Sequence, residues 1–320
     1  MKRSKSEVTI VECAPRDGLA ALSRTISVSD KVLVINSLSK AGLKKIDCVA
    51  FTHPRILPEN ADAEKVMQQI EKKPGVTYIG LAPSEIGCRR AMLTDIDEVL
   101  VLVAASEAFN RAALGLSVRE VLNKTLPTIS ETVAGRGKKI RAYILAAFGC
   151  PYSGRVPFER TVDIASRLAF LGAKEISLVD STGMASPRQV TKTVTELMDL
   201  KIGVNLGVHF HDTRGTALAN CVAAYEAGVR VFDTAIGGLS GTPFGAPGLE
   251  VGFWNVPTED LVHLFEQMGV RTGVKLERLL KTVEMAERMA GRELPGHILR
   301  AGLSSRLAEL PDPPSLKSLA

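Results

Sequence analysis

The regular alternation of short apolar runs with longer amphipathic segments is the feature of this sequence that most constrains its fold. Eight short runs, rich in β-branched residues, are predicted to be strands. Several are apolar almost throughout, as expected for parallel strands that are covered on both faces. The predicted strands are residues 8–11, 45–51, 76–81, 98–103, 140–147, 175–179, 206–211 and 229–236.

Helical patterns lie between these runs. The first is predicted to begin at Ser29, a residue type that caps helix N-termini, and to end at Gly42, where a left-handed residue commonly closes a helix. Similar amphipathic patterns predict the helices that follow. They cover residues 63–70, 84–93, 118–133, 157–171, 187–200, 216–227 and 258–268.

Eight strand–helix units of roughly 30 to 35 residues favour a (β/α)8 TIM barrel of the α/β class. A doubly wound open sheet is the alternative, but that fold often carries a Gly-rich phosphate loop after its first strand. Here the corresponding residues 13–18 read CAPRDG and contain no GxGxxG motif. We expect the barrel to occupy residues 1–272, a C-terminal helical addition 273–303, and a tail 304–320.

Composition narrows the class of partner. The chain of 320 residues has 40 Lys and Arg against 35 Asp and Glu, and this net charge of +5 is scattered along the sequence. With aromatic residues at only 5%, no basic and aromatic surface for nucleic acid is predicted, whereas an anionic small molecule suits the charge. Five widely spaced cysteines without a CxxC indicate a reducing compartment. No apolar run reaches about 18 residues, so we expect a cytoplasmic protein that does not enter a membrane.

The first candidate for chemistry is Arg16–Asp17, just past the first predicted strand. Catalytic groups of a TIM barrel lie where strands lead into the following loops. One interpretation is a simple turn, in which Gly18 would take a positive φ. The other is a carboxylate that binds a metal beside a cation that binds an anionic oxygen.

The second candidate is His209 and His211, at the end of the seventh predicted strand. Residues two apart on a strand face the same way, so both imidazoles project together. Only five histidines occur in the chain, so composition alone does not account for two of them lying two positions apart at the end of a strand. A buried core histidine is the alternative interpretation of either residue alone, but it explains the two together much less well than a pair of metal ligands does.

Two histidines and an aspartate leave open positions around a divalent metal. Mixed nitrogen and oxygen ligands suit Mg²⁺ or Mn²⁺, and Zn²⁺, Co²⁺ or Fe²⁺ would also be compatible with them. Another ligand is expected from the Gly-rich segment 237–248 or from Asn255 beyond it. A long flexible connection is the alternative interpretation of this segment, although long loops in compact domains are usually functional.

Taken together, these stretches resemble the 3-hydroxy-3-methylglutaryl-CoA lyase family, within the metal-dependent TIM-barrel lyase and synthase superfamily. The similarity runs from about residue 8 to about residue 303. Arg-Asp followed by His-x-His-Asp is specific for the superfamily, and two further pieces point to its lyase branch. The matching pieces include 15–19 (PRDGL), 105–109 (ASEAF), 149–152 (GCPY), 209–212 (HFHD) and 258–262 (TEDLV).

The resemblance implies a function and a set of site residues. The metal ligands would be Asp17, His209, His211 and Asn255, and Arg16 would stabilise the oxygen on which negative charge develops. The family reaction is a retro-Claisen cleavage of a 3-hydroxyacyl-CoA that releases a shorter acyl-CoA. The partner would therefore be an acyl-CoA substrate, and the resembling lyases are usually homodimers.

The sequence departs from the family pattern at the proton-transfer groups. Thr242 stands where the lyases carry a catalytic Cys, and a hydroxyl is a much poorer acid than a thiol. Asp47 replaces a Glu, and His53 replaces a Ser and is a candidate substitute acid or base, or a loop residue without a role. The loop after Thr242 is about four residues longer by comparison with the family pattern. It carries Trp254, so it is expected to reshape the acyl pocket.

Three other functions remain open on the sequence. A Claisen-condensing synthase of the same superfamily is disfavoured by the GCPY segment at 149–152. A 2-keto acid aldolase would not need CoA. A catalytically impaired metal-binding barrel is favoured only by the loss of the Cys at position 242, and the retained Arg16, Asp17, His209 and His211 argue against it.

Overall fold

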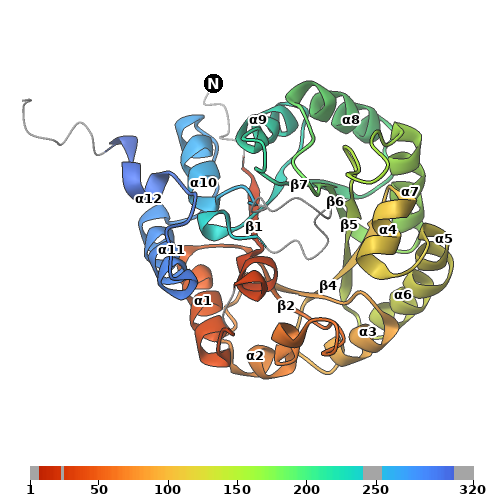
Figure 1. The fold of residues 1–320 in the computed structure, drawn as a ribbon, viewed down its shortest axis with the longest axis horizontal. Helices are drawn as coiled ribbons and strands as arrows, with labels where there is room; N and C mark the ends of the chain where they lie inside the picture. Colours follow the sequence, from red (N-terminus) through yellow and green to blue (C-terminus); the bar gives the residue numbers. More distant parts are fainter. Residues whose placement is uncertain (1–6, 23–24, 241–253, 306–320) are drawn as a thin grey trace, which may run out of the picture.

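The computed structural model describes residues 7–22, 25–240 and 254–305. Its eight strands are hydrogen-bonded in sequence order, and the first also pairs with the last, so the sheet closes into a parallel barrel (Figure 1). The predicted (β/α)8 TIM barrel is confirmed. The strands are β1 Thr9–Glu12, β2 Lys45–Ala50, β3 Thr77–Leu81, β4 Glu98–Ala104, β5 Lys139–Leu145, β6 Ala173–Asp180, β7 Asn205–Phe210 and β8 Val231–Thr234.

Helices form a ring around the barrel, as Figure 1 shows. Eight of them follow the strands as far as β7, at α1 Val28–Ala41, α2 Ala63–Gln69, α3 Glu85–Ala91, α4 Glu107–Leu114, α6 Leu126–Ala134, α7 Phe158–Phe170, α8 Pro187–Asp199 and α9 Ala217–Glu226. The C-terminal part adds α10 Thr258–Gln267, α11 Leu276–Ala290 and α12 Ile298–Ala301. Within the described residues, no helix has the length and apolar character needed to cross a membrane.

The structure corrects three details of the predicted helices. The first helix is capped by Ser27 rather than Ser29, because the Ser27 side chain accepts a hydrogen bond from the backbone N–H of Asp30; Gly42, at φ 100°, ends it as predicted. The single helix predicted over 118–133 is three pieces: α5 Val118–Glu120, a π-helical turn η4 Val121–Thr125, and α6. The short helix α4 was not predicted.

Two apolar layers surround the strands. The larger one lies between the barrel and the helices and includes Ile46, Val99 and Ile176. The smaller one fills part of the barrel interior and includes Ile79 and Leu100. Since side chains alternate along a strand, successive residues face the helices and the barrel interior in turn, and the inward-facing positions near the C-terminal end are available for a site.

Candidate active site at the barrel mouth

The mouth of the barrel, meaning the end where the strands run into the loops that follow them, collects the residues singled out in the sequence. Directly after β1 the chain makes a π-helical turn, η1 Ala14–Gly18. This turn carries Arg16 and Asp17. The Arg16 guanidinium lies 2.8 Å from Asp17 Oδ1 and 2.7 Å from Asp47 Oδ2 of β2. Arg16 is therefore held between two carboxylates.

Gly18 does not have the positive φ expected for a turn. Its φ is −78°, and it ends η1 with ordinary right-handed backbone. The structure shows a different need for glycine: a Cβ placed on Gly18 would lie 2.5 Å from the Cβ of Leu239. Gly18 thus permits the loop after β8 to approach η1.

His209 and His211 project into the mouth together, as predicted. Their ring centroids are 5.1 Å apart, and both side chains are buried. Burial disfavours the imidazolium, so it lowers the pKa of His209 to about 4 and that of His211 to about 3. Both rings are consequently neutral at pH 7, the form in which imidazole binds a metal.

Asn255 reaches the same place from the far side of the loop after β8. It forms an antiparallel bridge with His211, and its backbone N–H donates to Gly238. The side-chain Nδ2 donates to Asp17 Oδ2 at 2.8 Å and to the Leu239 carbonyl at 2.9 Å. Among the described residues, its buried Oδ1 has no hydrogen-bond partner of good geometry.

The two carboxylates beside Arg16 differ in charge preference. Burial alone would raise the pKa of Asp17, but Arg16, His209 and His211 outweigh it and hold that pKa below its usual value. Burial raises the pKa of Asp47 to about 6, although Arg16 opposes the rise. Asp17 is therefore the carboxylate of the two that favours the ionised form, which is the form that can bind a metal.

A cavity of about 470 Å³ opens above these residues and is lined by Arg16, Asp17, His209, His211, Ser240 and His53, among others. Arg16 is the only Lys or Arg among the described residues that line it. This volume lies within the range of about 300 to 1,000 Å³ found for small-molecule sites. The cavity thus brings five of the predicted residues into one pocket, and Asn255 and Asp47 contact two of them directly.

Three predicted residues lie at the edge of this arrangement or outside it. His53 is exposed at the rim, and its Nδ1 accepts a hydrogen bond from the backbone N–H of Arg55 at 3.2 Å. Trp254 is half-buried beneath the guanidinium of Arg292, 4.8 Å from the ring centroid, and is not among the residues that line the cavity. Thr242 lies outside the described residues.

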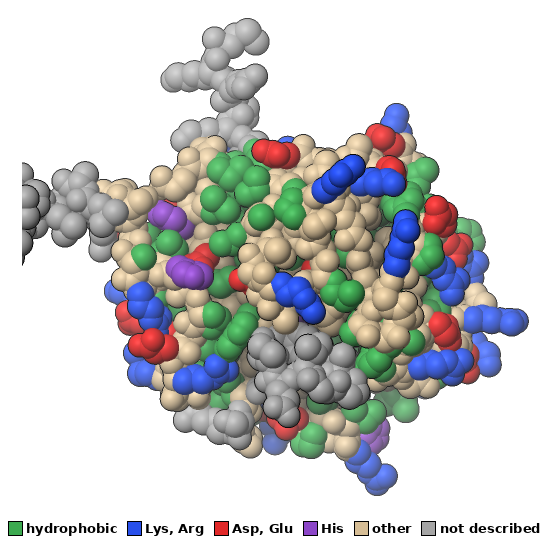
Figure 2. Space-filling model, turned by 45° about the horizontal axis from the view of Figure 1, so that its top comes forward, with side chains coloured by type: hydrophobic (Ala, Val, Ile, Leu, Met, Phe, Trp, Pro, Cys, Tyr) green, Lys and Arg blue, Asp and Glu red, His purple; other side chains and the backbone are tan. Residues whose placement is uncertain are grey.

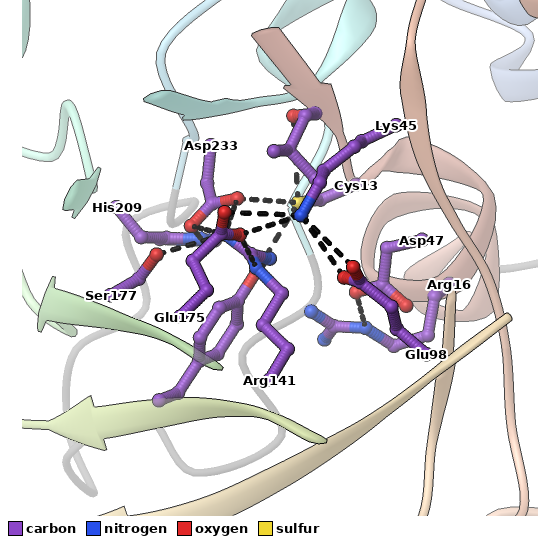
Figure 3. Close-up of polar contacts among 12 residues, drawn as sticks. Cys13, Arg16, Lys45, Asp47, Glu98, Arg141, Glu175, Ser177, His209 and Asp233 are labelled. Carbon is purple, nitrogen blue, oxygen red and sulfur yellow. Dashed lines mark hydrogen bonds and ion pairs between the residues drawn. The ribbon is translucent and has the colours of Figure 1, made fainter. Parts of the chain in front are cut away.

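An interior network of charges lies below the mouth and was not predicted from the sequence. Arg141 of β5 donates to Glu175 at 2.6 Å, Ser177 at 2.8 Å and Asp233 at 2.6 Å. Lys45 lies 3.0 Å from both Glu98 and Glu175 (Figure 3). We call this group the interior network; its members are Lys45, Glu98, Arg141, Tyr143, Glu175, Ser177 and Asp233. The sequence signal for this network was a charged residue inside an otherwise apolar predicted strand, as Arg141 is in β5.

A second set of metal-binding atoms lies at the border of the network, because ligand atoms of Cys13, His209 and Asp233 fall within 4.8 Å of one another. Two observations argue against a metal there. Arg141 already pairs with Asp233 through two hydrogen bonds, and burial raises the pKa of the Cys13 thiol well above its usual value. A neutral thiol and a neutralised carboxylate are poor ligands.

The residues at the mouth fit a divalent metal better. Asp17 provides an ionised carboxylate, the two histidines provide neutral rings, and Asn255 offers an amide oxygen that no described residue engages with good geometry. Such an unpartnered buried oxygen is costly unless a ligand satisfies it. Mixed nitrogen and oxygen donors of this kind suit a borderline or hard cation.

Comparison with known proteins shows the family of this chain. Residues 7–286 match the family described as HMGL-like. The chain is 40% identical over 300 residues to hydroxymethylglutaryl-CoA lyase YngG of Bacillus subtilis, covering 93% of this chain and 98% of the relative. It is 34% identical over 297 residues to the mitochondrial hydroxymethylglutaryl-CoA lyase of Mus musculus, covering 92% and 89%.

Solved structures give the same result. The crystal structure of the Bacillus subtilis HMG-CoA lyase superposes with a TM-score of 0.88 at 39% identity, covering 92% of this chain and 98% of that one. An HMG-CoA lyase from Acinetobacter baumannii, solved with coenzyme A and 3-methylmalate, gives a TM-score of 0.90 at 32% identity, covering 97% and 100%. With a match over most of its length in family, relatives and fold, this chain belongs to the HMGL-like family.

Proposed function

We propose that this protein is a divalent-metal-dependent carbon–carbon lyase that cleaves a 3-hydroxyacyl-CoA by a retro-Claisen reaction. The substrate would be hydroxymethylglutaryl-CoA or a related thioester. The observation that carries the proposal is the convergence of Arg16, Asp17, His209, His211 and Asn255 at one cavity. The relatives named as hydroxymethylglutaryl-CoA lyases, and the one solved with coenzyme A, support the choice of substrate class.

Asp17, His209, His211 and Asn255 are the proposed metal ligands, and we propose Mg²⁺ or Mn²⁺ as the ion. A bound divalent cation would supply Lewis acidity and lower the pKa of the substrate's C3 hydroxyl. The chain's own contribution is preorganisation: Arg16 and Asn255 both bond Asp17, so its carboxylate is fixed before any ligand binds.

Arg16 is the proposed electrostatic catalyst. Its guanidinium reaches the cavity and already faces Asp47 and Asp17, so it is oriented by two ion pairs. Negative charge develops on the thioester oxygen as the carbon–carbon bond breaks and an enolate forms. A fixed cation near that oxygen stabilises the transition state more than the ground state.

The enolate carbon must finally receive a proton. The hydroxyl of Thr242 is a weak donor, so we propose His53 at the cavity rim for this role. Because its Nδ1 accepts a hydrogen bond from the Arg55 backbone N–H, the neutral ring would carry its proton on Nε2, the nitrogen that would transfer it. The shorter acyl-CoA then leaves with that proton on its methyl carbon.

The test is turnover by the purified protein with Mg²⁺ or Mn²⁺ and hydroxymethylglutaryl-CoA, followed as release of the shorter acyl-CoA. His209→Ala should lower kcat/KM at least about a thousandfold, since it removes a proposed ligand. His263→Ala is the matched control because His263 does not line the cavity. No turnover across a panel of 3-hydroxyacyl-CoA thioesters would overturn the lyase assignment in favour of a synthase, an aldolase or an impaired homologue.

Thr242→Cys and His53→Ala separate the two proposals for the proton donor. A large gain in Thr242→Cys would show that only the loop donor is missing, whereas a loss of at least about a hundredfold in His53→Ala would place the proton on His53. Normal activity in His53→Ala contradicts its role.

We also propose that the protein is a cytoplasmic homodimer without a nucleic-acid or membrane partner. Its surface supports the absence of a nucleic-acid partner, because Lys and Arg are interspersed with Asp and Glu on the face shown in Figure 2. Light scattering of the purified protein tests the assembly: a mass of twice 34.3 kDa is expected, and a monomer contradicts it.

A further inference from the structure

The cavity at the mouth has two chemically different halves. The metal-ligand candidates and Arg16 come from η1, β7 and the segments after β8. The opposite half is lined by Leu81, Leu102 and Leu145 from β3, β4 and β5, together with Phe109, Ala113 and Leu114 of α4. In a closed barrel of eight strands, β3, β4 and β5 lie across the axis from β7, β8 and β1. The reacting groups therefore face an apolar wall.

The apolar half offers a ligand few hydrogen bonds, because the two hydroxyls on this side, of Tyr143 and Ser84, already accept from Arg141 and from the Gly87 N–H. The backbones of β4 and β5 pair with each other over the whole of both strands, from Glu98 with Lys139 to Ala104 with Leu145. The neighbouring side-chain amide of Asn110 is also committed: its Oδ1 accepts from Ala104 N–H and its Nδ2 donates to Leu116. A polar ligand group placed here would lose its water without gaining a partner.

This chemistry selects between two parts of an acyl-CoA. The pantetheine arm carries two amides, each of which would be left unsatisfied against the leucines. An alkyl branch has nothing to satisfy, and each methylene gains from leaving water. An alkyl branch on C3, the carbon that carries the hydroxyl, starts beside the metal-ligand candidates and extends across the barrel axis.

We propose that the apolar half of the cavity is a subsite for an alkyl substituent on C3 that is longer than a methyl group. The inference rests on the proposed function, because C3 is located by the metal-ligand candidates. The favoured substrate class is then a 3-hydroxy-3-alkylglutaryl-CoA or a similar branched 3-hydroxyacyl-CoA. The carbon–carbon bond that breaks is the same as before; the alkyl branch leaves with the ketone product.

The first measurement is of binding alone and does not require cleavage of the ligand. Analogues that lack the C3 hydroxyl, 3-methyl-, 3-propyl- and 3-pentylglutaryl-CoA, cannot undergo the cleavage, and calorimetry gives their Kd. We expect affinity to rise roughly fourfold for each added methylene until the subsite is full. Affinity that is flat or falls with branch length overturns the proposal.

The second measurement compares kcat/KM for the corresponding hydroxylated thioesters in the wild type and in Ala113→Phe, which fills the subsite with a ring. Because Ala113 is only half-buried, we expect helix α4 to accept the change, and circular dichroism checks the fold. Ala112→Phe, on the exposed face of the same helix, is the matched control. We expect Ala113→Phe to lower kcat/KM for the pentyl substrate at least tenfold relative to the methyl substrate.

Equal losses for the methyl and pentyl substrates would place the pantetheine arm against α4 and overturn the proposal. The two proposals fail in different ways. If no thioester is cleaved but the analogues still bind more tightly with longer branches, the lyase function fails and the subsite stands. If hydroxymethylglutaryl-CoA is cleaved without any preference for branch length, the function stands and the subsite fails.

Discussion

In the interior network every buried charge meets an opposite charge, whereas in the mouth cluster (Arg16, Asp17, Asp47, His209, His211 and Asn255) several buried polar atoms have no such partner. Among the described residues, no buried side-chain atom of the network is without a hydrogen bond, but Asp47 Oδ1, His209 Nδ1 and Asn255 Oδ1 have no hydrogen bond of good geometry. Both groups lie inside the same barrel (Figure 3). The buried charges of the interior network therefore stabilise the fold, whereas the mouth cluster has polar atoms that a ligand can still bind.

The physical basis of this difference is desolvation. Removing a charge from water costs several kcal/mol, and only good pairing geometry offsets it. Arg141 meets this condition with Glu175, Ser177 and Asp233 around one guanidinium. In the mouth cluster, pairing within the protein does not offset all of this desolvation cost. A metal or substrate that binds there satisfies the remaining polar atoms.

The largest expected effect is at the mouth. Asp17→Asn keeps the shape of the side chain but removes the ligand charge, so we expect kcat/KM to fall at least about a thousandfold and Mn²⁺ affinity to fall with it. The free energy of unfolding in urea should change by less than about 1 kcal/mol. If Asp17→Asn keeps more than a tenth of the activity, the mouth cluster does not differ from the interior network in the way proposed.

The next largest effect is on stability, in the interior network. Arg141→Met leaves Glu175 and Asp233 buried without their cation, so the free energy of unfolding should fall by about 3–5 kcal/mol. Urea unfolding in the presence of a chelator measures it. Arg111→Met on the surface is the control and should cost less than about 0.5 kcal/mol, because its side chain is 62% exposed. A cost below 1 kcal/mol for Arg141→Met would contradict a structural role.

Gly18→Ala tests how closely η1 and the loop after β8 must approach. The added methyl group would lie 2.5 Å from the Cβ of Leu239, whose carbonyl accepts a hydrogen bond from Asn255. We expect a loss of about 1–3 kcal/mol of stability from overpacking, together with weaker Mn²⁺ binding. Thermal unfolding and metal titration measure the two effects; unchanged metal binding would show that Asn255 is positioned independently of η1.

The smallest effect is the pH dependence of stability that His209 contributes. Burial lowers the pKa of His209 to about 4, so below about pH 6.5 the unfolded chain takes up a proton that the folded chain does not. The contribution of His209 to stability therefore decreases as pH falls, by about 1 kcal/mol between pH 7 and 5.5. His209→Gln in chelator should lack this part of the pH dependence; identical pH profiles would refute it.

Much of the site could be predicted from the sequence because its members follow strand ends. Arg16 and Asp17 come directly after a short apolar run, and His209 and His211 have the spacing that places two side chains on one face. In a closed parallel barrel these strand ends meet at one mouth, so local patterns sufficed to bring together residues almost 200 positions apart.

The interior network could not be found in this way. Arg141, Glu175 and Asp233 lie on three strands, and nothing local to any of them indicates that β8 and β5 present their charges to each other. The role of Gly18 was hidden for the same reason, since the contact that excludes a Cβ comes from Leu239, more than 200 residues away. The division of 118–133 by a π-helical turn also escaped the amphipathic pattern.

The sequence by itself determined the barrel, the order of its strands and the residues that could bind a metal. These depend on hydrophobic periodicity and on strand spacing, which are local properties of the chain. Only the tertiary structure decided that Asn255 holds Asp17, that the interior charges are fully paired, and that the reacting groups face an apolar wall on β3, β4, β5 and α4. Those features depend on which strands lie opposite one another, and that is settled only when the barrel closes.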